Sequence, residues 1–174
     1  MFYSHLKGHV EALLFASGEP LPLPKIAQVL EIEVDNARLL LDQLNEDFSS
    51  ENRGLTIVEV GGGYQLCTKP ELATIVERLA HVREAKLSTA AMETIAVVAF
   101  KQPVTKQEIE IIRGVKVDKA LTTLVERGLV KELGRKDTIG RPILYGTTET
   151  FLQCFGLRSL EELPQLNDML TEQP

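Results

Sequence analysis

Hydrophobic residues recur at helical spacing in three successive segments near the start of the chain. The apolar positions are, in order, Leu6, Val10, Leu13 and Leu14; then Ile26, Val29 and Leu30; and then Ala37, Leu40, Leu41, Leu44 and Phe48. The second segment begins at Pro24, which early helix positions tolerate because they need no backbone donor. The pattern predicts three helices, each of which turns one apolar face toward a core.

The period of the pattern then changes from that of a helix to that of a strand. The segments LTIVEV at 55–60 and YQLCT at 64–68 are separated by glycines at 61–63. Glycine accepts the positive φ angles that tight hairpin turns require. These segments therefore predict two antiparallel strands joined by a short turn.

The same order of elements repeats in the second half of the chain. The helical stripes there are Met92, Ile95, Ala96 and Ala99; then Ile109 and Ile112; and then Val117, Leu121, Leu124 and Val125. Ser88 is placed to cap the first of these helices, and Thr105 and Glu108 have the spacing of a capping box. Gly128 can end the third helix in a left-handed conformation.

Strands are predicted at 129–133 and 142–147, on either side of a polar loop. Three helices followed by a two-stranded hairpin is the plan of a winged-helix domain, and this chain carries the plan twice. The predicted fold class is therefore mainly α with small β-hairpins (α+β), arranged as tandem winged-helix domains.

A further helix is predicted between the two copies by the spacing of Leu72, Ile75, Val76 and Leu79. We expect this linking helix to belong to an N-terminal domain at 1–83. The second domain is expected at 84–158, and a partly disordered C-terminal tail at 159–174.

Charge differs between the two copies. Residues 1–83 carry 7 Lys and Arg against 12 Asp and Glu, a net charge of −5, whereas residues 84–150 carry 11 against 9, a net charge of +2. The third helix of the first copy exposes the acidic residues Asp35, Asp42, Glu46 and Asp47. Because these carboxylates would repel phosphates, we do not expect this helix to read DNA.

Weak DNA contact stays open for the second copy, whose basic residues are interleaved with acidic ones. The candidates are Arg113, Lys116, Lys119, Arg135 and Lys136. A mixed, solvated surface is the alternative interpretation of the same residues, and we favour it because the whole chain has a net charge of −6.

The stretch GRPILYGTT at 140–148 combines a basic turn with an aromatic strand. Proline has no backbone donor, so Pro142 belongs at a strand start or a sheet edge. Arginine and tyrosine are enriched at interfaces, which favours Arg141, Pro142 and Tyr145 as a docking surface for a protein partner. The alternative is that Tyr145 packs on the helix that follows, and that Arg141 is simply exposed.

Side chains that could carry chemistry are few. His5 and His9 stand four residues apart, a spacing that can hold a metal, but no third ligand is evident. Cys67 and Cys154 have apolar neighbours, and we interpret both as small buried residues of a protein in a reducing compartment. No apolar run approaches the ~20 residues that span a bilayer. We expect no enzymatic activity, no cofactor, no metal and no membrane contact.

Several stretches together resemble the bacterial segregation and condensation protein B family. They are ALLFASGEPL at 12–21, GGGYQLCTKPE at 61–71, GRPILYGTT at 140–148 and FLQCFGLRSLEELPQL at 151–166. The resemblance implies a non-enzymatic accessory subunit of the bacterial condensin complex, which forms homodimers chiefly through its first winged-helix domain.

The resemblance also implies a partner and a cellular role. The partner is the kleisin, segregation and condensation protein A, which bridges the heads of the structural-maintenance-of-chromosomes ATPase. The implied role is chromosome condensation and segregation during cell division, in the cytoplasm and in association with the nucleoid. The alternative function is a winged-helix transcription regulator that binds DNA through its second domain.

Two sets of residues are the candidate contacts of such a scaffold. Phe2, Tyr3 and Leu6 extend the first apolar stripe, and we expect them at the dimer interface because large exposed apolar patches mark partner surfaces. Arg141, Pro142 and Tyr145 are the expected kleisin contacts.

Overall fold

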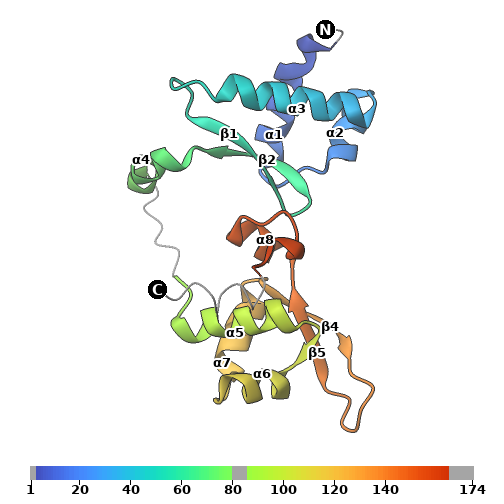
Figure 1. Cartoon of the computed structure of the whole chain (residues 1–174), viewed down its shortest axis with the longest axis vertical. Helices are drawn as coiled ribbons and strands as arrows, with labels where there is room; N and C mark the ends of the chain where they lie inside the picture. The colour runs from blue at the N-terminus through green and yellow to red at the C-terminus, as the bar shows by residue number, and fades with distance from the viewer. Residues whose placement is uncertain (1–2, 80–85, 165–174) are drawn as a thin grey trace. The chain divides into compact units, whose positions relative to one another are not determined.

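The computed structural model describes residues 3–79 and 86–164, apart from the side chain of Ser4. The chain divides into two compact units, Met1–Arg83 and Glu84–Pro174, which we call unit 1 and unit 2. Figure 1 shows unit 1 in blue to green and unit 2 in yellow-green to red. Both units combine helices with a small antiparallel sheet.

The described part of unit 1 follows the order of elements that the hydrophobic pattern predicts. Its elements are η1 (Ser4–Leu6), α1 (Lys7–Ser17), α2 (Leu23–Leu30), α3 (Val34–Phe48), β1 (Leu55–Val60), β2 (Gly63–Thr68), η2 (Pro70–Leu72) and α4 (Ala73–Leu79). Helices α1, α2 and α3 pack on one another, and the β1–β2 hairpin closes the core that they form.

The hairpin of unit 1 turns at two glycines. Gly61 has a φ of 56° and Gly62 a φ of 77°, which are the positive angles expected for a tight turn between twisted strands. Backbone groups of Leu21 and Tyr64 exchange two hydrogen bonds of 2.9 Å, so the loop before α2 lies along the outer edge of β2. The edge strand is thereby covered near the turn.

Unit 2 repeats the order of helices and hairpin, with one strand added. Its elements are α5 (Thr89–Lys101), β3 (Val104–Thr105), α6 (Lys106–Arg113), α7 (Asp118–Glu126), β4 (Val130–Arg135), β5 (Ile143–Thr147), α8 (Glu149–Phe155) and η3 (Leu160–Glu162). The sheet has the strand order β3-β5-β4, and both pairings are antiparallel.

The predicted helix ends of unit 2 are confirmed. The Ser88 hydroxyl accepts a hydrogen bond from the Ala91 N–H at 3.2 Å, and the capping box of Thr105 and Glu108 is complete. Gly128, with a φ of 67°, follows α7. A further cap, which was not among these predictions, is at α8, where the Thr148 hydroxyl accepts a hydrogen bond from the Phe151 N–H at 3.1 Å.

Several apolar residues that were predicted to face the core are exposed, so these predictions are wrong. Ile112 is 52% exposed, and Val29 and Val125 are exposed as well. Helix α6 has only eight residues, and among them Ile109 is the buried one, because two turns present a narrow stripe to the core. The apolar stripe of α4 is exposed from Ile75 onward.

Two further features concern the predicted boundaries and the membrane. Residues 159–164 of the predicted tail are described, and Leu163 packs against the core of unit 2, whereas residues 165–174 lie outside the described part of the chain. None of the described helices combines the length and the apolar character needed to cross a bilayer.

Candidate functional site

A groove on unit 2 runs between α6 and the strand β5, and its volume is about 540 Å³. Its lining residues are Lys106, Gln107, Glu110, Lys116, Arg135, Pro142, Ile143 and Tyr145. The groove brings two of the expected docking residues, Pro142 and Tyr145, together with charged residues of α6. The sequence alone did not indicate that α6 would form the opposite wall.

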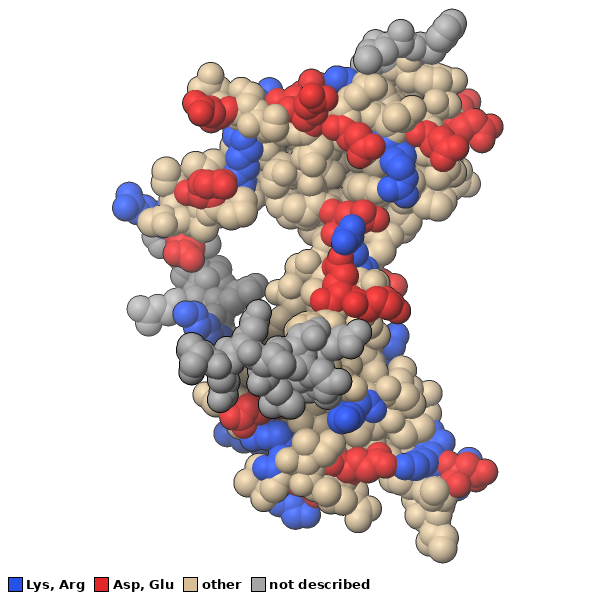
Figure 2. Space-filling model, viewed as in Figure 1, with Lys and Arg blue, Asp and Glu red and all other residues tan. Residues whose placement is uncertain are grey.

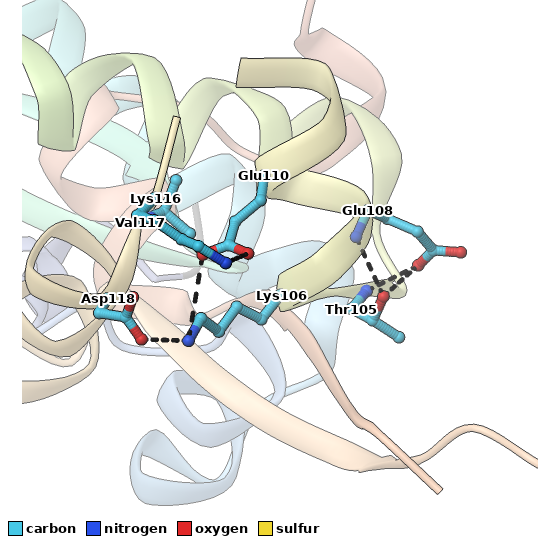
Figure 3. A network of polar contacts seen from close by, with 7 residues as sticks. All are labelled: Thr105, Lys106, Glu108, Glu110, Lys116, Val117 and Asp118. Atoms are coloured by element: carbon cyan, nitrogen blue, oxygen red, sulfur yellow. Dashed lines mark hydrogen bonds and ion pairs between the residues drawn. The ribbon is translucent and has the colours of Figure 1, made fainter. Parts of the chain in front are cut away.

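The short strand β3 explains why α6 lies beside Tyr145. Val104 pairs with Tyr145 and Thr105 with Leu144, so α6 begins at the edge of the sheet. The Glu108 carboxylate accepts hydrogen bonds of 2.8 Å from both the N–H and the hydroxyl of Thr105 (Figure 3). The Lys136 ammonium and these Thr105 donors lower the pKa of Glu108 to about 2, so the cap is charged at neutral pH.

Charged side chains of α6 and α7 form a network beside the groove (Figure 3). The Lys106 ammonium contacts the carboxylates of Asp118 and Glu110. Glu110 also accepts hydrogen bonds from the Lys116 ammonium at 3.0 Å and from the Val117 N–H at 3.3 Å. The hydrogen bond from Lys116 lowers the pKa of Glu110, and the one from Lys106 lowers the pKa of Asp118. The network links α6 to the start of α7 beside the groove.

Tyr145 contributes to the core and to the groove at once. It is half-buried, packs against the core of unit 2 and also lines the groove. Burial raises the pKa of its phenol, and the carboxylate of Glu132 acts in the same direction. A tyrosine with a packed ring is a rigid contact surface, since little side-chain entropy is left to lose on binding.

Arg141 lies at the turn beside the groove rather than in its lining. Its φ is 40°, an angle that is uncommon for a residue with a side chain. The Arg141 N–H donates to the Thr138 carbonyl at 2.9 Å, and its own carbonyl accepts a bond from the Arg135 guanidinium at 3.0 Å. These bonds close the hairpin loop and leave the Arg141 side chain exposed.

Three of the basic residues considered for DNA contact are engaged with carboxylates of unit 2. Arg113 pairs with Glu93, and its guanidinium also donates to the Ala90 carbonyl at 3.0 Å and the Thr94 hydroxyl at 2.9 Å. The side chain of Arg113 is therefore only 13% exposed.

The other candidates differ in their surroundings. Lys116 pairs with Glu110, Lys136 pairs with Glu108, and Arg135 donates to the Arg141 carbonyl. Lys119 is exposed on α7. Figure 2 shows both signs of charge interleaved on unit 2. Cations that already neutralise carboxylates add less to phosphate binding than unpaired ones.

The acidic face expected on α3 is present in unit 1. Asp35, Asp42, Glu46 and Asp47 are all exposed, and Figure 2 shows acidic side chains gathered over this helix. The guanidinium of Arg38, also on α3, donates to the Tyr64 hydroxyl on the hairpin at 3.0 Å.

The residues expected at a dimer interface are placed as follows. Phe2 lies outside the described residues, Tyr3 is exposed, and Leu6 packs against the core of its own unit. A more exposed apolar side chain was missed: Phe15 of α1 is 79% exposed, with Gly8 and Ala12 exposed on that helix as well. The signal was available, because Phe15 lies off the stripe that α1 turns to the core.

The described histidine and cysteine side chains do not form a metal site. His5 and His9 are exposed, and within residues 3–79 and 86–164 no group of three or more His, Cys, Asp or Glu side chains could hold a metal ion. The interpretation of Cys154 as buried is wrong, since α8 turns it outward. Cys67 is half-buried, and burial raises the pKa of its thiol.

Comparison with known proteins identifies the family. The family model described as "Segregation and condensation complex subunit ScpB" matches residues 8–166. The segregation and condensation protein B of Symbiobacterium thermophilum is 54% identical over 164 residues, which cover 94% of this chain and 75% of that protein. The protein of the same name from Moorella thermoacetica is 48% identical over 172 residues, covering 99% and 88%. The chain belongs to the segregation and condensation protein B family.

Solved structures of similar proteins also exist. ScpB from Mycobacterium tuberculosis is 33% identical, with a TM-score of 0.42 and coverage of 87% of this chain and 95% of that one. A structure described as a dimer of the ScpB N-terminal domain complexed with ScpA peptide is 40% identical, with a TM-score of 0.44 and coverage of 46% and 100%.

Proposed function

We propose that this protein is a non-enzymatic scaffold subunit of the bacterial structural-maintenance-of-chromosomes complex. It forms a homodimer, binds the kleisin subunit ScpA, and acts in chromosome condensation and segregation during cell division. Each unit is a winged-helix domain, and the protein works in the cytoplasm in association with the nucleoid. Membership of the family across residues 8–166 is the observation that carries the proposal.

The groove between α6 and β5 is the surface we assign to the kleisin. Pro142, Ile143 and Tyr145 supply apolar contact area, and Lys106, Lys116 and Arg135 supply positive charge around Glu110. Because the ion pairs of Figure 3 already restrain the charged side chains of α6 beside the groove, these side chains lose less rotamer freedom when a kleisin segment binds. Arg141 adds an exposed cation beside Pro142.

The exposed apolar side chains of unit 1 support self-association. Phe15 and Tyr3 both meet solvent in the single chain. Burying a phenylalanine side chain stabilises a contact by about 1.5–3 kcal/mol. A second copy that covers Phe15 would remove it from water, and Gly8 and Ala12 would allow the two α1 backbones to approach closely.

One experiment with two variants tests both contacts, using light scattering for the mass and titration calorimetry for ScpA binding. We expect Phe15→Glu to be monomeric, because an unpaired carboxylate opposes burial in an apolar contact. We expect Tyr145→Ala to stay dimeric but to bind ScpA at least about tenfold more weakly, as truncation of a central interface tyrosine does.

Two matched variants separate binding from folding. Tyr145→Phe keeps the packed ring and should retain most of the ScpA affinity. Phe155→Ala removes an aromatic ring elsewhere in unit 2 and should leave the ScpA affinity unchanged. A monomeric wild-type chain would overturn the dimer. If Tyr145→Ala bound ScpA with unchanged affinity, the groove assignment would be overturned. A gel shift that depends on the DNA sequence would favour the transcription regulator.

A further inference from the structure

Helix α4 carries an apolar stripe that the described part of unit 1 does not cover. Leu72, Ile75, Val76 and Leu79 have the i, i+3, i+4, i+7 spacing of one helix face. Leu72 is half-buried, whereas Ile75 is 65% exposed and Leu79 is 83% exposed. All residues of α4 are exposed, and Figure 1 shows the helix standing apart from α1, α2 and α3. A helix this short gains little stability in water from its own hydrogen bonds, so its apolar face indicates contact with a partner.

The start of this helical segment is fixed to the rest of unit 1. The Lys69 N–H donates to the Gly54 carbonyl at 2.9 Å, and the Lys69 ammonium donates to the Ser50 carbonyl at 2.8 Å. Residues 70–72 and the loop between α3 and β1 together line a groove of about 720 Å³. Because its start is anchored in this way, α4 presents its stripe to solvent from a fixed base.

The same loop connects α4 with the dimer contact proposed above for α1. Arg53 lines the groove at the start of α4, and its guanidinium lies 3.9 Å from the Glu11 carboxylate on α1. Phe15 follows Glu11 by one helical turn, on the same side of α1. A phenylalanine buries about 150–250 Å², whereas a stable interface buries about 800 Å² on each partner. The Phe15 contact therefore leaves most of a dimer interface unassigned, and the stripe of α4 is an exposed apolar surface linked to it through Arg53.

Charged residues beside the stripe indicate which partner fits it. Glu71 and Arg78 are seven residues apart, or about two turns, so they lie on the same flank of the stripe. Both are exposed, and within residues 3–79 and 86–164 neither takes part in an ion pair. When two copies of a helix pair antiparallel about a twofold axis, identical flanks face each other in reverse order. Glu71 of each copy then faces Arg78 of the other, and Leu72 faces Leu79.

We propose that α4 pairs with α4 of a second copy of this chain, antiparallel about a twofold axis. Ile75, Val76 and Leu79 of each copy cover those of the other, and Glu71 and Arg78 form symmetry-related ion pairs at the edge of the contact. A second copy matches the charges of this helix as well as its apolar stripe. The inference deepens the proposed homodimer and rests on it, but it assigns a surface separate from Phe15.

The dimer dissociation constant of the full chain, measured by analytical ultracentrifugation, tests the apolar contact. Ile75→Ser should raise this Kd at least about tenfold, because each copy loses an apolar contact at the centre of the pair. The Ile75 side chain is exposed in the single chain, so the fold of unit 1 should be retained, which circular dichroism checks. Ile139→Ser makes the same change at an exposed isoleucine of unit 2 and should leave the Kd unchanged.

Charge reversal tests the antiparallel arrangement. Glu71→Arg and Arg78→Glu should each raise the Kd at least about threefold, because each places like charges opposite each other at both ends of the pair. The double variant Glu71→Arg/Arg78→Glu restores opposite charges and should return the Kd to within about twofold of the wild-type value. Glu77→Arg changes the same charge on the side of α4 away from the stripe and should have no effect.

The outcomes separate this inference from the proposed homodimer. A wild-type chain that is monomeric at every concentration would overturn both. A wild-type dimer that Phe15→Glu weakens and Ile75→Ser does not would overturn the α4 contact alone. If Ile75→Ser weakened ScpA binding in calorimetry and left the dimer unchanged, the kleisin would be the occupant and the α4 pairing would be overturned. Single reversals that the double variant does not rescue would overturn the antiparallel arrangement.

Discussion

In unit 1 the hairpin turns from β1 to β2 through Gly61 and Gly62, whereas in unit 2 a loop of charged and polar residues separates β4 from β5. The tight glycine turn carries no side chain that could contact a partner. The longer loop places Pro142 at the mouth of a groove and Arg141 beside it. The same order of elements therefore produces a bare glycine turn in one unit and one wall of a groove in the other.

The third helices differ in a similar way. Helix α3 is 15 residues long and exposes acidic side chains, while α7 has 9 residues and joins a mixed-charge network through Asp118. Neither surface is the continuous basic strip that phosphate binding favours. A repeated backbone plan therefore leaves the surface chemistry of each unit to loop length and to the pairing of charges.

The largest effect is expected from truncating one buried leucine in the core of either unit. Leu41 of α3 and Leu124 of α7 are matched positions, each buried in the core of its own unit. Leu41→Ala and Leu124→Ala should each lower the free energy of unfolding by about 2–5 kcal/mol, because the lost side chain leaves a cavity. Hydrogen exchange should show the loss of protection only in the unit that carries the substitution.

An exposed residue is the control for these two variants. Ile139→Ala truncates a fully solvated side chain of the β4–β5 loop and should change stability by less than about 0.5 kcal/mol. If either core variant removed protection from both units equally, the division into two independent cores would be wrong.

A smaller difference is expected between two strand glycines. A Cβ on Gly63 would lie 2.8 Å from the Leu21 carbonyl carbon and 2.9 Å from the Pro20 carbonyl carbon, both backbone atoms, and Leu21 is held there by its hydrogen bonds to Tyr64. Gly63→Ala should therefore cost about 1–3 kcal/mol in urea unfolding, as overpacking does.

Gly146→Ala is the matched change in unit 2. Its Cβ would lie 2.6 Å from the Leu133 side chain and 2.8 Å from the Gln102 side-chain oxygen. Leu133 is exposed and can rotate toward solvent, and the Gln102 oxygen ends a side chain rather than belonging to the backbone, so the loss of stability should be the smaller of the two. Equal losses, or a larger one for Gly146→Ala, would show that the unit 1 hairpin is not the more tightly packed one.

The smallest effect concerns pH and the start of α6. The pKa of Glu108 is about 2 in the folded chain, against an ordinary value of 4.5, so the carboxylate stabilises unit 2 above pH 4.5 and loses this contribution as the pH falls toward 2. Helix α2, its counterpart in unit 1, has no side-chain cap. When the melting temperature is measured as the pH is lowered, the loss of stability that depends on Glu108 should therefore occur in unit 2 only.

Glu108→Gln should lower the melting temperature at pH 7 and flatten its dependence on pH between 4.5 and 2. Glu126→Gln removes an exposed carboxylate from α7 and serves as the control. If the two variants had the same pH profile, Glu108 would not be the group whose protonation weakens the α6 cap.

Part of the fold could be predicted because it depends on neighbours along the chain. The caps at Ser88 and Thr105 use donors and acceptors three residues apart, so the residue types alone indicate them. The exposure of Ile112 could not be predicted, since a two-turn helix can bury either of two neighbouring apolar faces. Strand β3 has two residues and exists only because β5 lies beside it.

Only some residues of the candidate site could be predicted from the sequence. Pro142 and Tyr145 were indicated by the local motif of a turn followed by an aromatic strand. Lys106 and Glu110 were not, because they enter the groove from a helix that is distant in sequence. The pairings of Arg113 with Glu93 and of Lys136 with Glu108 likewise join separate elements.

From sequence alone, the spacing of apolar side chains, the capping residues and the glycine turn determined the order of helices and hairpins in both units. Those features act over one or two turns of backbone, where geometry follows directly from residue type. Only the tertiary structure decided which helix forms the opposite wall of the groove, which cations are already paired, and that Cys154 faces solvent. Burial and ion pairing depend on which distant segments meet, and a linear pattern of residues does not record that.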